Sequence, residues 1–311
     1  MGIVKAVCIS KKKGTQKRPV AVGHFMTDWG LEGDAHAGHW HRQISLLSLE
    51  KIEAFRQRGV QIAYGDFGEN LVVSDIDFSA LPVGTLLQCG EVLLEITQIG
   101  KECHQHCTIY QAVGDCIMPR EGVFAKVLHD GIIRPGDTMK IIPRQEKRPY
   151  QAAVITLSDT GSRGERIDES GPVIVQTLQE RDYDVVETIL LPDGEDALQR
   201  QLIRLADQRQ VDLILTTGGT GLGQRDVTPE ATLAVATRLV PGIAEAMRSA
   251  SLKITKRAML SRAVSVIRGK TLIINLPGSP KACRECMAVF LDTIPHGMDL
   301  LRGDVSNCAA K

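Results

Sequence analysis

Residues 211–231 constrain the fold more than any other stretch of the chain. They read VDLILTTGGTGLGQRDVTPEA. Val211–Leu215 is a short apolar run, typical of a strand buried on both faces. The glycine-rich loop Thr216–Gly223 follows. TPE at 228–230 then predicts a helix start, with a hydroxyl cap, a proline at the first helical position and an acid in the first turn. This order predicts an α/β unit.

The same stretch predicts a site for an anion. Free backbone N–H groups and the positive end of a helix dipole meet where a glycine loop leads into a helix, and phosphate is the usual ligand there. Asp226 would supply an oxygen ligand to a phosphate-bound Mg²⁺. The alternative is that the glycines only serve the turn, as in any α/β protein. The loop is neither a P-loop nor GxGxxG, so its spacing predicts an anion or nucleotide site and no more.

Further strands are predicted at Ala152–Leu157, Tyr183–Leu191 and Leu272–Leu276, alternating with helices. Polar and glycine residues follow each of them, and ligands of open α/β sheets bind beyond the carboxyl ends of strands. Asp193 lies in such a loop, as Asp226 does, so the two carboxylates are predicted to meet over one Mg·nucleotide. The alternative for Asp193 is an ordinary turn residue.

The first half of the chain reads differently. Short strands separated by Pro82, Gly84 and Gly90 favour a β-barrel-like domain. Ser48 is predicted to cap a helix that places Leu49, Ile52 and Phe55 on one face; this face would pack on the barrel. We expect one domain over 1–145, a linker over 146–151 and a second domain over 152–311.

Histidines and cysteines raise the question of metal. His36, His39 and His41 with Asp34 suit zinc or iron, whereas the glycines around them indicate close backbone approach to another group. Of eight cysteines, three cluster as Cys103, Cys107 and Cys116, and two pair as Cys283 and Cys286. The pair falls on one face of a predicted helix and is interpreted as packing thiols rather than a redox pair.

Composition excludes several classes of function. Thirty-seven basic and thirty-seven acidic residues balance, and aromatic residues make up 4% of the chain, so no nucleic-acid partner is predicted. No apolar run is long enough to span a membrane, and the first residues lack a signal-peptide pattern. We therefore expect a soluble, cytoplasmic protein with reduced thiols.

Five motifs in the second half, in order from about Ala152 to Asp304, resemble the molybdopterin adenylyltransferase (Mog/MoaB-like) family: TTGGTG, RDVTPEA, PGIAEAMR, LSRA and NLPGSPKA. The resemblance implies a three-layer α/β fold and transfer of AMP from ATP to the terminal phosphate of molybdopterin, with Mg²⁺. It implies that Asp193 and Asp226 are the catalytic, metal-associated pair. It also implies these pocket residues: Ser158, Asp159, Gly218, Gly219, Thr220, Gly221, Glu245, Ser261, Arg262, Asn275, Pro277, Gly278 and Ser279.

Six motifs between about Val4 and Ile142 resemble, in order, the MOSC domain, named for the carboxyl-terminal part of molybdenum cofactor sulfurase: GLEGDAHAG, HRQISLLS, GDFGENL, EITQIGKECH, GVFAKVL and RPGDTMKI. The resemblance implies a mainly-β barrel that handles cofactor or sulfur, with Cys103 as the matching cysteine. It is also associated with molybdenum-ion and pyridoxal phosphate binding. The alternatives for Cys103 are a structural zinc site with Cys107, Cys116 and a histidine, or inert thiols. Arg120 is a candidate contact for the pterin phosphate by its charge.

Both halves thus indicate molybdenum cofactor biosynthesis. The first hypothesis is an enzyme, an ATP- and Mg-dependent adenylyltransferase joined to a MOSC domain. The second is a non-catalytic carrier of molybdopterin or finished cofactor, and the third is a phosphoryl or pyrophosphate hydrolase on the same fold. The expected partners are the small-molecule substrates and molybdenum-inserting proteins or molybdoenzymes. The resemblance also implies a homotrimer. Molybdenum and tungsten are not distinguished.

Overall fold

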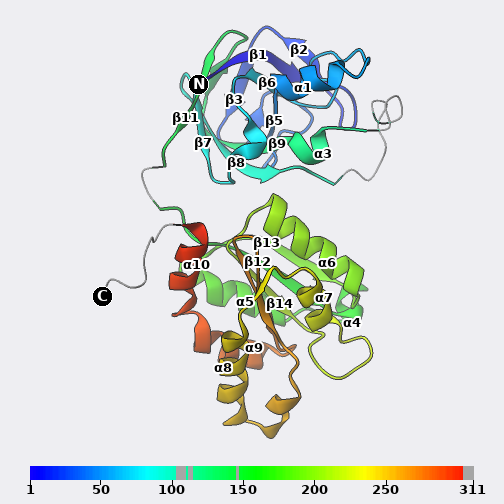
Figure 1. Cartoon of the computed structure of the whole chain (residues 1–311), viewed down its shortest axis with the longest axis vertical. Coiled ribbons are helices and arrows are strands. Elements are labelled where there is room, and N and C mark those ends of the chain that lie inside the picture. Colours follow the sequence, from blue (N-terminus) through cyan, green and yellow to red (C-terminus); the bar gives the residue numbers. More distant parts are fainter. Residues whose placement is uncertain (103–109, 111–114, 145–146, 304–311) are drawn as a thin grey trace. The chain divides into compact units, whose positions relative to one another are not determined.

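The computed structural model describes residues 1–102, 110, 115–144 and 147–303. Cys103 and Cys107 lie outside the described residues. The chain divides into two compact units, Met1–Arg148 and Pro149–Lys311, and each is described by itself (Figure 1). Within the described residues, no helix is long and apolar enough to cross a membrane.

The first unit contains a closed β-barrel, which confirms the predicted fold class. Seven strands pair in the order β11-β7-β8-β9-β5-β6-β1, and β11 pairs back onto β1 to close the ring. The small strand β2 continues from β1, and β10, β3 and β4 form a separate sheet. The strands are β1 (Gly2–Ile9), β2 (Arg18–Val20), β3 (Gly23–Met26), β4 (Gly30–Leu31), β5 (Ile44–Ser48), β6 (Leu71–Ser74), β7 (Leu86–Cys89), β8 (Val92–Ile99), β9 (Val123–His129), β10 (Gly131–Ile133) and β11 (Thr138–Ile142).

Two apolar clusters lie on opposite faces of the barrel wall. Leu46 of β5 faces the interior, whereas Leu47 packs outward with Ile52 and Phe55 of helix α1 (Leu49–Arg56). The remaining helical segments are the 3₁₀ turn η1 (Phe78–Ala80) and α3 (Met118–Glu121). The predicted apolar face of α1 is present. Ser48 is the N-cap residue, as predicted, but its hydroxyl donates to Ile76 O and accepts from Phe78 N and makes no capping bond to the helix.

A β-bulge sets which side chains of β1 enter the barrel. The register of β1 against β6 shifts by one residue between Val4 and Ala6. Side chains alternate between faces along a strand, so one extra residue exchanges the faces beyond it. Val4 and Val7 therefore both belong to the interior cluster, although they are three residues apart, while Ala6 packs on the outer one.

The second unit is a three-layer α/β domain, as predicted. Its sheet has the order β13-β12-β14-β17-β16-β15, with the first four strands parallel and the last two antiparallel to their neighbours. The strands are β12 (Gln151–Leu157), β13 (Asp184–Leu191), β14 (Leu213–Thr217), β15 (Arg238–Leu239), β16 (Ser265–Arg268) and β17 (Thr271–Leu276). The predicted strand at Val211–Leu215 is thus displaced by two residues toward the glycine loop.

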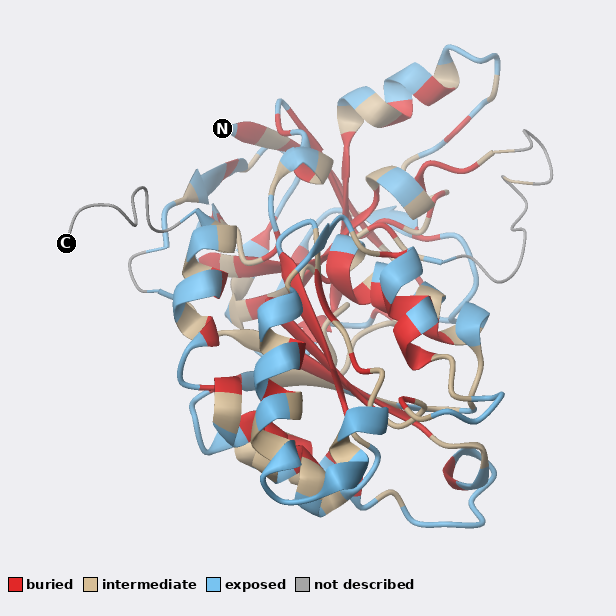
Figure 2. Cartoon of the chain, turned by 60° about the horizontal axis from the view of Figure 1, so that its bottom comes forward, coloured by how far each residue is buried: buried red, intermediate tan, exposed pale blue. Residues whose placement is uncertain are grey.

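Helices cover both faces of this sheet (Figure 2). One face carries α5 (Ser170–Gln179), α8 (Pro241–Leu252), α9 (Pro280–Phe290) and α10 (Ile294–Arg302), and the other carries α6 (Glu195–Ile203), the π-helical turn η2 (Arg204–Gln208) and α7 (Thr228–Ala234). The short α4 (Asp159–Ser162) and η3 (Lys256–Leu260) complete the unit. Central strands alternate between the two cores: Leu213 and Leu215 face one, Ile214 the other. Burial on both faces explains the unbroken apolar runs of the sequence.

Cys283 and Cys286 are residues of α9 whose side chains pack in the core. Burial raises the pKa of Cys283 to about 11. A thiol with so high a pKa is a poor nucleophile at neutral pH. This confirms the interpretation as packing thiols.

A buried carboxyl in the barrel makes the first unit sensitive to pH. Glu69 is 0% exposed; its Oε1 accepts from Gly65 N at 2.6 Å, and its Oε2 has no hydrogen-bond partner among the described residues. Burial raises the pKa of Glu69 from 4.5 to about 7. Between these two values the folded chain holds a proton that the unfolded chain has released, so rising pH lowers stability across that window.

We predict that Glu69→Gln abolishes this dependence. The free energy of unfolding of the wild type should fall by about 2–3 kcal/mol between about pH 5 and pH 8, whereas that of the variant should stay level. Trp29 and Trp40 are the two tryptophans of the chain, so their fluorescence reports unfolding of this unit in urea. The exposed Glu91→Gln is the matched control. Identical pH profiles for the wild type and Glu69→Gln would contradict the prediction.

Candidate functional site

Four loops meet at one edge of the C-terminal sheet. β12, β13, β14 and β17 are parallel, so their carboxyl ends, and the loops that follow them, lie together. These loops begin at Ser158, Pro192, Gly218 and Pro277. Their closeness is measured directly at one point: a Cβ added to Gly278 would lie 3.6 Å from the Cα of Gly218. The predicted gathering of polar residues at this edge is therefore present.

The glycine loop is held by the side chain of Thr228. Its hydroxyl donates to Gly218 O at 2.9 Å, and its backbone N–H donates to Gly219 O at 3.1 Å. The predicted role of Thr228 as helix cap is wrong: Val227 is the cap residue, and Thr228 is the first residue of α7, with its hydroxyl directed back to the loop. Gly218 and Gly219 both have positive φ, 94° and 63°. Only glycine adopts such angles without strain.

Asp159 and Asp193 exchange backbone hydrogen bonds. Asp159 N–H donates to Asp193 Oδ2 at 3.1 Å, and Asp193 N–H donates to Asp159 Oδ1 at 3.0 Å. The loops after β12 and β13 are thus joined through two carboxylates that partly face each other. Burial raises the pKa of Asp193, and the nearby charges of Asp159 and Asp226 raise it further. An arrangement of this kind favours the approach of a cation.

Asp226 lies at the far end of the glycine loop. Its Oδ2 accepts from Gly223 N at 2.8 Å, and a Cβ on Gly221 or Gly223 would lie within 2.9 Å of the same oxygen. Asp193 lies near the start of the loop, since its Oδ1 is 3.6 Å from the position of a Cβ on Gly219. The structure therefore brings Asp193 and Asp226 to the same loop, as the sequence predicted.

Asn275, at the carboxyl end of β17, is the buried polar centre beneath the loop. Its amide donates to the hydroxyls of Thr216 and Thr232, each at 2.9 Å, and its Oδ1 accepts from Val264 N at 3.3 Å. It is fully buried and saturated by protein groups. Its contacts are those of a residue that positions β14, α7 and β16, rather than one presented to a ligand.

The other pocket residues divide by position. Ser158 accepts from Gly161 N at 3.0 Å, Gly278 O accepts from the Ser170 hydroxyl at 3.0 Å, and Ser279 caps α9. Thr220 O accepts from Arg262 N–H at 3.1 Å, which places Ser261 and Arg262 beside the loop. Glu245 is exposed on α8, and within the described residues no hydrogen bond or ion pair joins it to these loops. Arg225 contacts both Asp159 and Asp193, and sequence reasoning missed it as a site residue although it opens the RDVTPEA motif.

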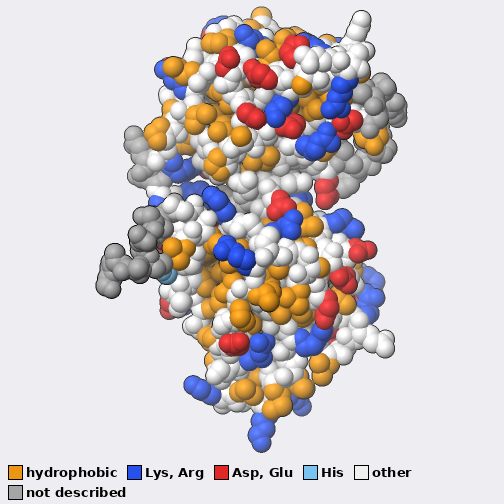
Figure 3. Space-filling view, viewed as in Figure 1, with side chains coloured by type: hydrophobic (Ala, Val, Ile, Leu, Met, Phe, Trp, Pro, Cys, Tyr) orange, Lys and Arg blue, Asp and Glu red, His pale blue; other side chains and the backbone are white. Residues whose placement is uncertain are grey.

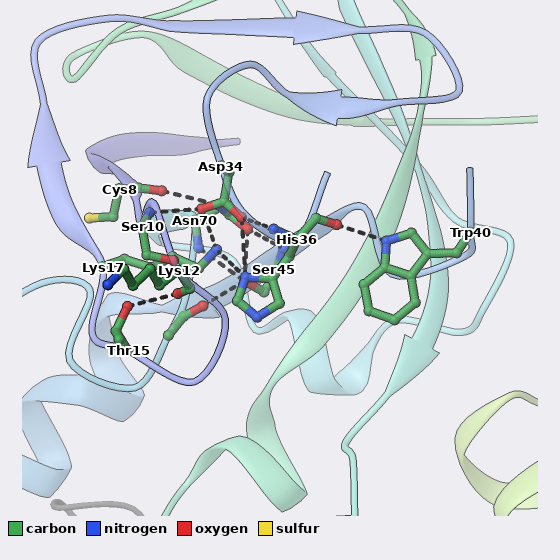
Figure 4. Close-up of polar contacts among 11 residues, drawn as sticks. Cys8, Ser10, Lys12, Thr15, Lys17, Asp34, His36, Trp40, Ser45 and Asn70 are labelled. Atoms are coloured by element: carbon green, nitrogen blue, oxygen red, sulfur yellow. Dashed lines mark hydrogen bonds and ion pairs between the residues drawn. The ribbon is translucent and has the colours of Figure 1, made fainter. Parts of the chain in front are cut away.

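In the barrel, Asp34 is the centre of a buried polar cluster (Figure 4). Its Oδ2 accepts from Lys17 Nζ at 2.6 Å and from Ser10 N at 3.0 Å, and its Oδ1 accepts from His36 N at 2.9 Å. These donors hold the pKa of Asp34 well below its usual range despite its burial. The carboxylate is thus already neutralised by a buried lysine, which is an arrangement that leaves it unsuited to a metal ion.

The predicted metal site in this region is not present among the residues that the structure describes. His39 pairs with Asp28, and His41 pairs with Gln98, so the three histidines have separate partners. No group of three or more histidine, cysteine or acidic side chains in the described ranges is placed to hold a metal ion. The Arg120 guanidinium pairs with Asp115 at 3.0 Å, and the anion contact suggested by its charge stays a prediction.

We predict that Gly219→Ala destabilises the glycine loop. The new Cβ would lie 2.4 Å from the Thr228 hydroxyl oxygen at a φ of 63°, so both sterics and backbone oppose it. The free energy of unfolding should fall by about 1–3 kcal/mol. Calorimetry measures this loss, and hydrogen exchange of residues 213–234 localises it. Gly242→Ala, where nothing lies within 4 Å of the added Cβ, is the control. Unchanged exchange in Gly219→Ala would refute the proposed constraint.

Comparison with known proteins agrees with these two units. The family model of the probable molybdopterin binding domain matches residues 153–296, and that of the MOSC domain matches residues 33–140. The molybdopterin adenylyltransferase of Helicobacter pylori is 43% identical over 153 residues, which are 49% of this chain and 87% of that protein. The molybdopterin adenylyltransferase of Escherichia coli is 39% identical over 165 residues, 48% of this chain and 84% of that protein.

Among solved structures, the molybdopterin biosynthesis Mog protein from Mycobacterium ulcerans is 37% identical, with a TM-score of 0.48, and the match covers 50% of this chain and 99% of that one. The curated relatives are matched over most of their own length by the C-terminal half of this chain. Through that half, the chain belongs to the molybdopterin adenylyltransferase family, and it joins to it a MOSC domain.

Proposed function

We propose that the C-terminal unit adenylylates molybdopterin with ATP and Mg²⁺ during molybdenum cofactor biosynthesis. The observation that carries the proposal is that Asp193 and Asp226 both lie against one glycine loop, Asp193 near Gly219 and Asp226 near Gly221 and Gly223, at the edge where four parallel strands end. This family's relatives are named for the same reaction. The N-terminal MOSC domain would bind or hand on the cofactor or its sulfur.

The residues present fit a magnesium site of the kind that nucleotides bring with them. Mg²⁺ is usually bound through one or two carboxylates together with substrate phosphates. Asp193 and Asp226 are such a pair, and each uses one oxygen for a backbone N–H while the other oxygen has no hydrogen bond within the described residues. When bound, Mg²⁺ would neutralise charge on the transferring phosphate.

The reaction joins two anions, so positioning and charge neutralisation are its main requirements. An oxygen of the terminal phosphate of molybdopterin bonds to the α-phosphorus of ATP, the bond from that phosphorus to the bridging oxygen of the β-phosphate breaks, and pyrophosphate leaves. The glycine loop between Gly218 and Gly221, held by Thr228, would orient the phosphates through its backbone N–H groups. The attacking phosphate is already ionised, so no side chain is needed to remove a proton.

We also propose that the C-terminal unit forms a homotrimer, as the family resemblance implies. Its surface supports self-association, because hydrophobic side chains gather on the face shown in Figure 3. Leu239, Ile254, Met259 and Leu260 are at least half exposed, and a monomer rarely exposes so many large apolar side chains in one short stretch.

We predict that Asp226→Asn reduces adenylylation by at least about a hundredfold, because the amide keeps an acceptor for Gly223 N but removes the charge. Purified protein is incubated with molybdopterin, ATP and Mg²⁺, and both adenylylated molybdopterin and pyrophosphate are measured. Asp193→Asn should behave similarly.

The control is Asp184→Asn, an exposed aspartate at the amino end of β13, where the opposite edge of the sheet lies. It should retain full activity. If the wild type binds molybdopterin tightly but yields no adenylylated product, the enzymatic proposal fails and the protein is a carrier.

A further inference from the structure

Two arginines contact the glycine loop, and they are used in different ways. Arg262 is committed to the protein: its Nε donates to Gly221 O at 2.7 Å, its Nη2 donates to Asp226 O, and its Nη1 pairs with Glu230. All three nitrogens of this guanidinium have partners in the fold. Arg262 therefore shapes the loop, and this contrasts with the role that the family resemblance implied, of contacting a ligand.

Arg225 uses only one edge of its guanidinium. Its Nε lies 2.6 Å from Asp159 Oδ2 and its Nη2 lies 2.8 Å from Asp159 Oδ1, which is a side-on, two-point pairing. The same Nη2 donates to Asp193 O at 2.6 Å. A guanidinium has five N–H donors, of which these contacts use three. Both donors of Nη1 have no protein acceptor among the described residues, and the side chain is 65% exposed.

The charge balance at this edge calls for a cation there. Asp159, Asp193 and Asp226 place three carboxylates where a polyphosphate would arrive, and two like charges in such a site oppose each other. Arg225 is held against the first two of these aspartates and precedes the third in sequence. An arginine offers paired N–H donors in the flat geometry that matches phosphate oxygens.

Resting on the function proposed above, we propose that Arg225 binds the nucleotide's polyphosphate through Nη1, and that Asp159 orients it for this contact. The ligand class is a nucleoside triphosphate, and the leaving pyrophosphate carries the same recognised group. Asp159 holds Nε and Nη2, and the Asp193 carbonyl takes the second donor of Nη2, so Nη1 is left for the ligand. The residue thus adds a positive contact to a site whose other side chains are acidic.

The rival explanation is that the Arg225–Asp159 pair only ties the two loops together. The two explanations make opposite predictions for Asp159. If the Arg225–Asp159 pair only joins the loops, removing either partner weakens ligand binding to the same degree. If Arg225 is the anion contact, Asp159→Asn keeps one oxygen that can accept from the guanidinium and orient it, but removes the charge that competes with the anion, so anion binding is kept or strengthened.

The test is pyrophosphate binding by the full-length protein, measured by calorimetry in EDTA so that no metal ion takes part. We expect Arg225→Gln to weaken binding by about tenfold or more, as loss of one charge-assisted contact would. Arg225→Lys should recover part of the loss, since the charge returns without the fork. Asp159→Asn should bind as well as the wild type or better.

The matched control is Arg163→Gln, another exposed arginine near Asp159, whose own partner is Glu165 at 2.7 Å. It should bind pyrophosphate within about twofold of the wild type, because only the general field changes. Equal losses in Arg225→Gln and Asp159→Asn, or no loss in Arg225→Gln, would overturn the proposal. Because binding is measured without turnover, a wild type that binds pyrophosphate through Arg225 but makes no adenylylated product would refute the proposed function alone.

Discussion

The parallel alignment of β13, β12, β14 and β17 is the constraint on which the C-terminal unit depends. β12, β14 and β17 are buried on both faces, so the sheet meets a ligand at its edges. Parallel strands end together, and their last carbonyl and N–H groups need partners there. The loops supply these partners to one another: Thr217 donates to Pro277 O at 2.7 Å, and Ser158 N–H donates to Leu191 O at 2.9 Å. The site is therefore built from the same bonds that finish the sheet.

Electrostatics then decides what such an edge can bind. Burial raises the pKa of Asp193, and the charges of Asp159 and Asp226 raise it further, so a cation beside this carboxylate would favour its ionised form. Backbone N–H groups of a glycine loop act in the opposite sense, since they favour an anion. The site thus holds carboxylates, which attract a cation, beside N–H groups, which attract an anion. It is suited to a ligand that contains both kinds of charge, such as a polyphosphate with its divalent cation. One such ligand would account for both the carboxylates and the N–H groups.

Sequence predicted the parts of this site that depend on local order, and missed those that depend on contacts across the chain. The apolar runs and the glycines located the strands and the loop between them, because burial on both faces and positive φ leave a direct mark on residue choice. The contacts of Arg225 join residues 66 and 32 positions apart, and no spacing rule marks them. Thr228 was misread for a related reason: a threonine before a proline is typical of a cap, but here its hydroxyl is used by Gly218.

In the barrel, too, sequence reasoning missed a contact between residues far apart in the chain, and here the contact involves a buried charge. The histidines and Asp34 have the residue types of a metal site, but the sequence does not show that Lys17 pairs with Asp34. Lys17 lies 17 residues earlier, and its side chain reaches the buried carboxylate of Asp34. A buried ion pair adds little net stability, since desolvation offsets most of its attraction. This ion pair instead holds parts of the chain in position. One carboxylate binds the backbone N–H groups of Ser10 and His36 and the side chain of Lys17, and so joins two loops to the end of β1. His36 is partly exposed, and its bonds to Asp34 hold it in place although its own loop is rich in glycine.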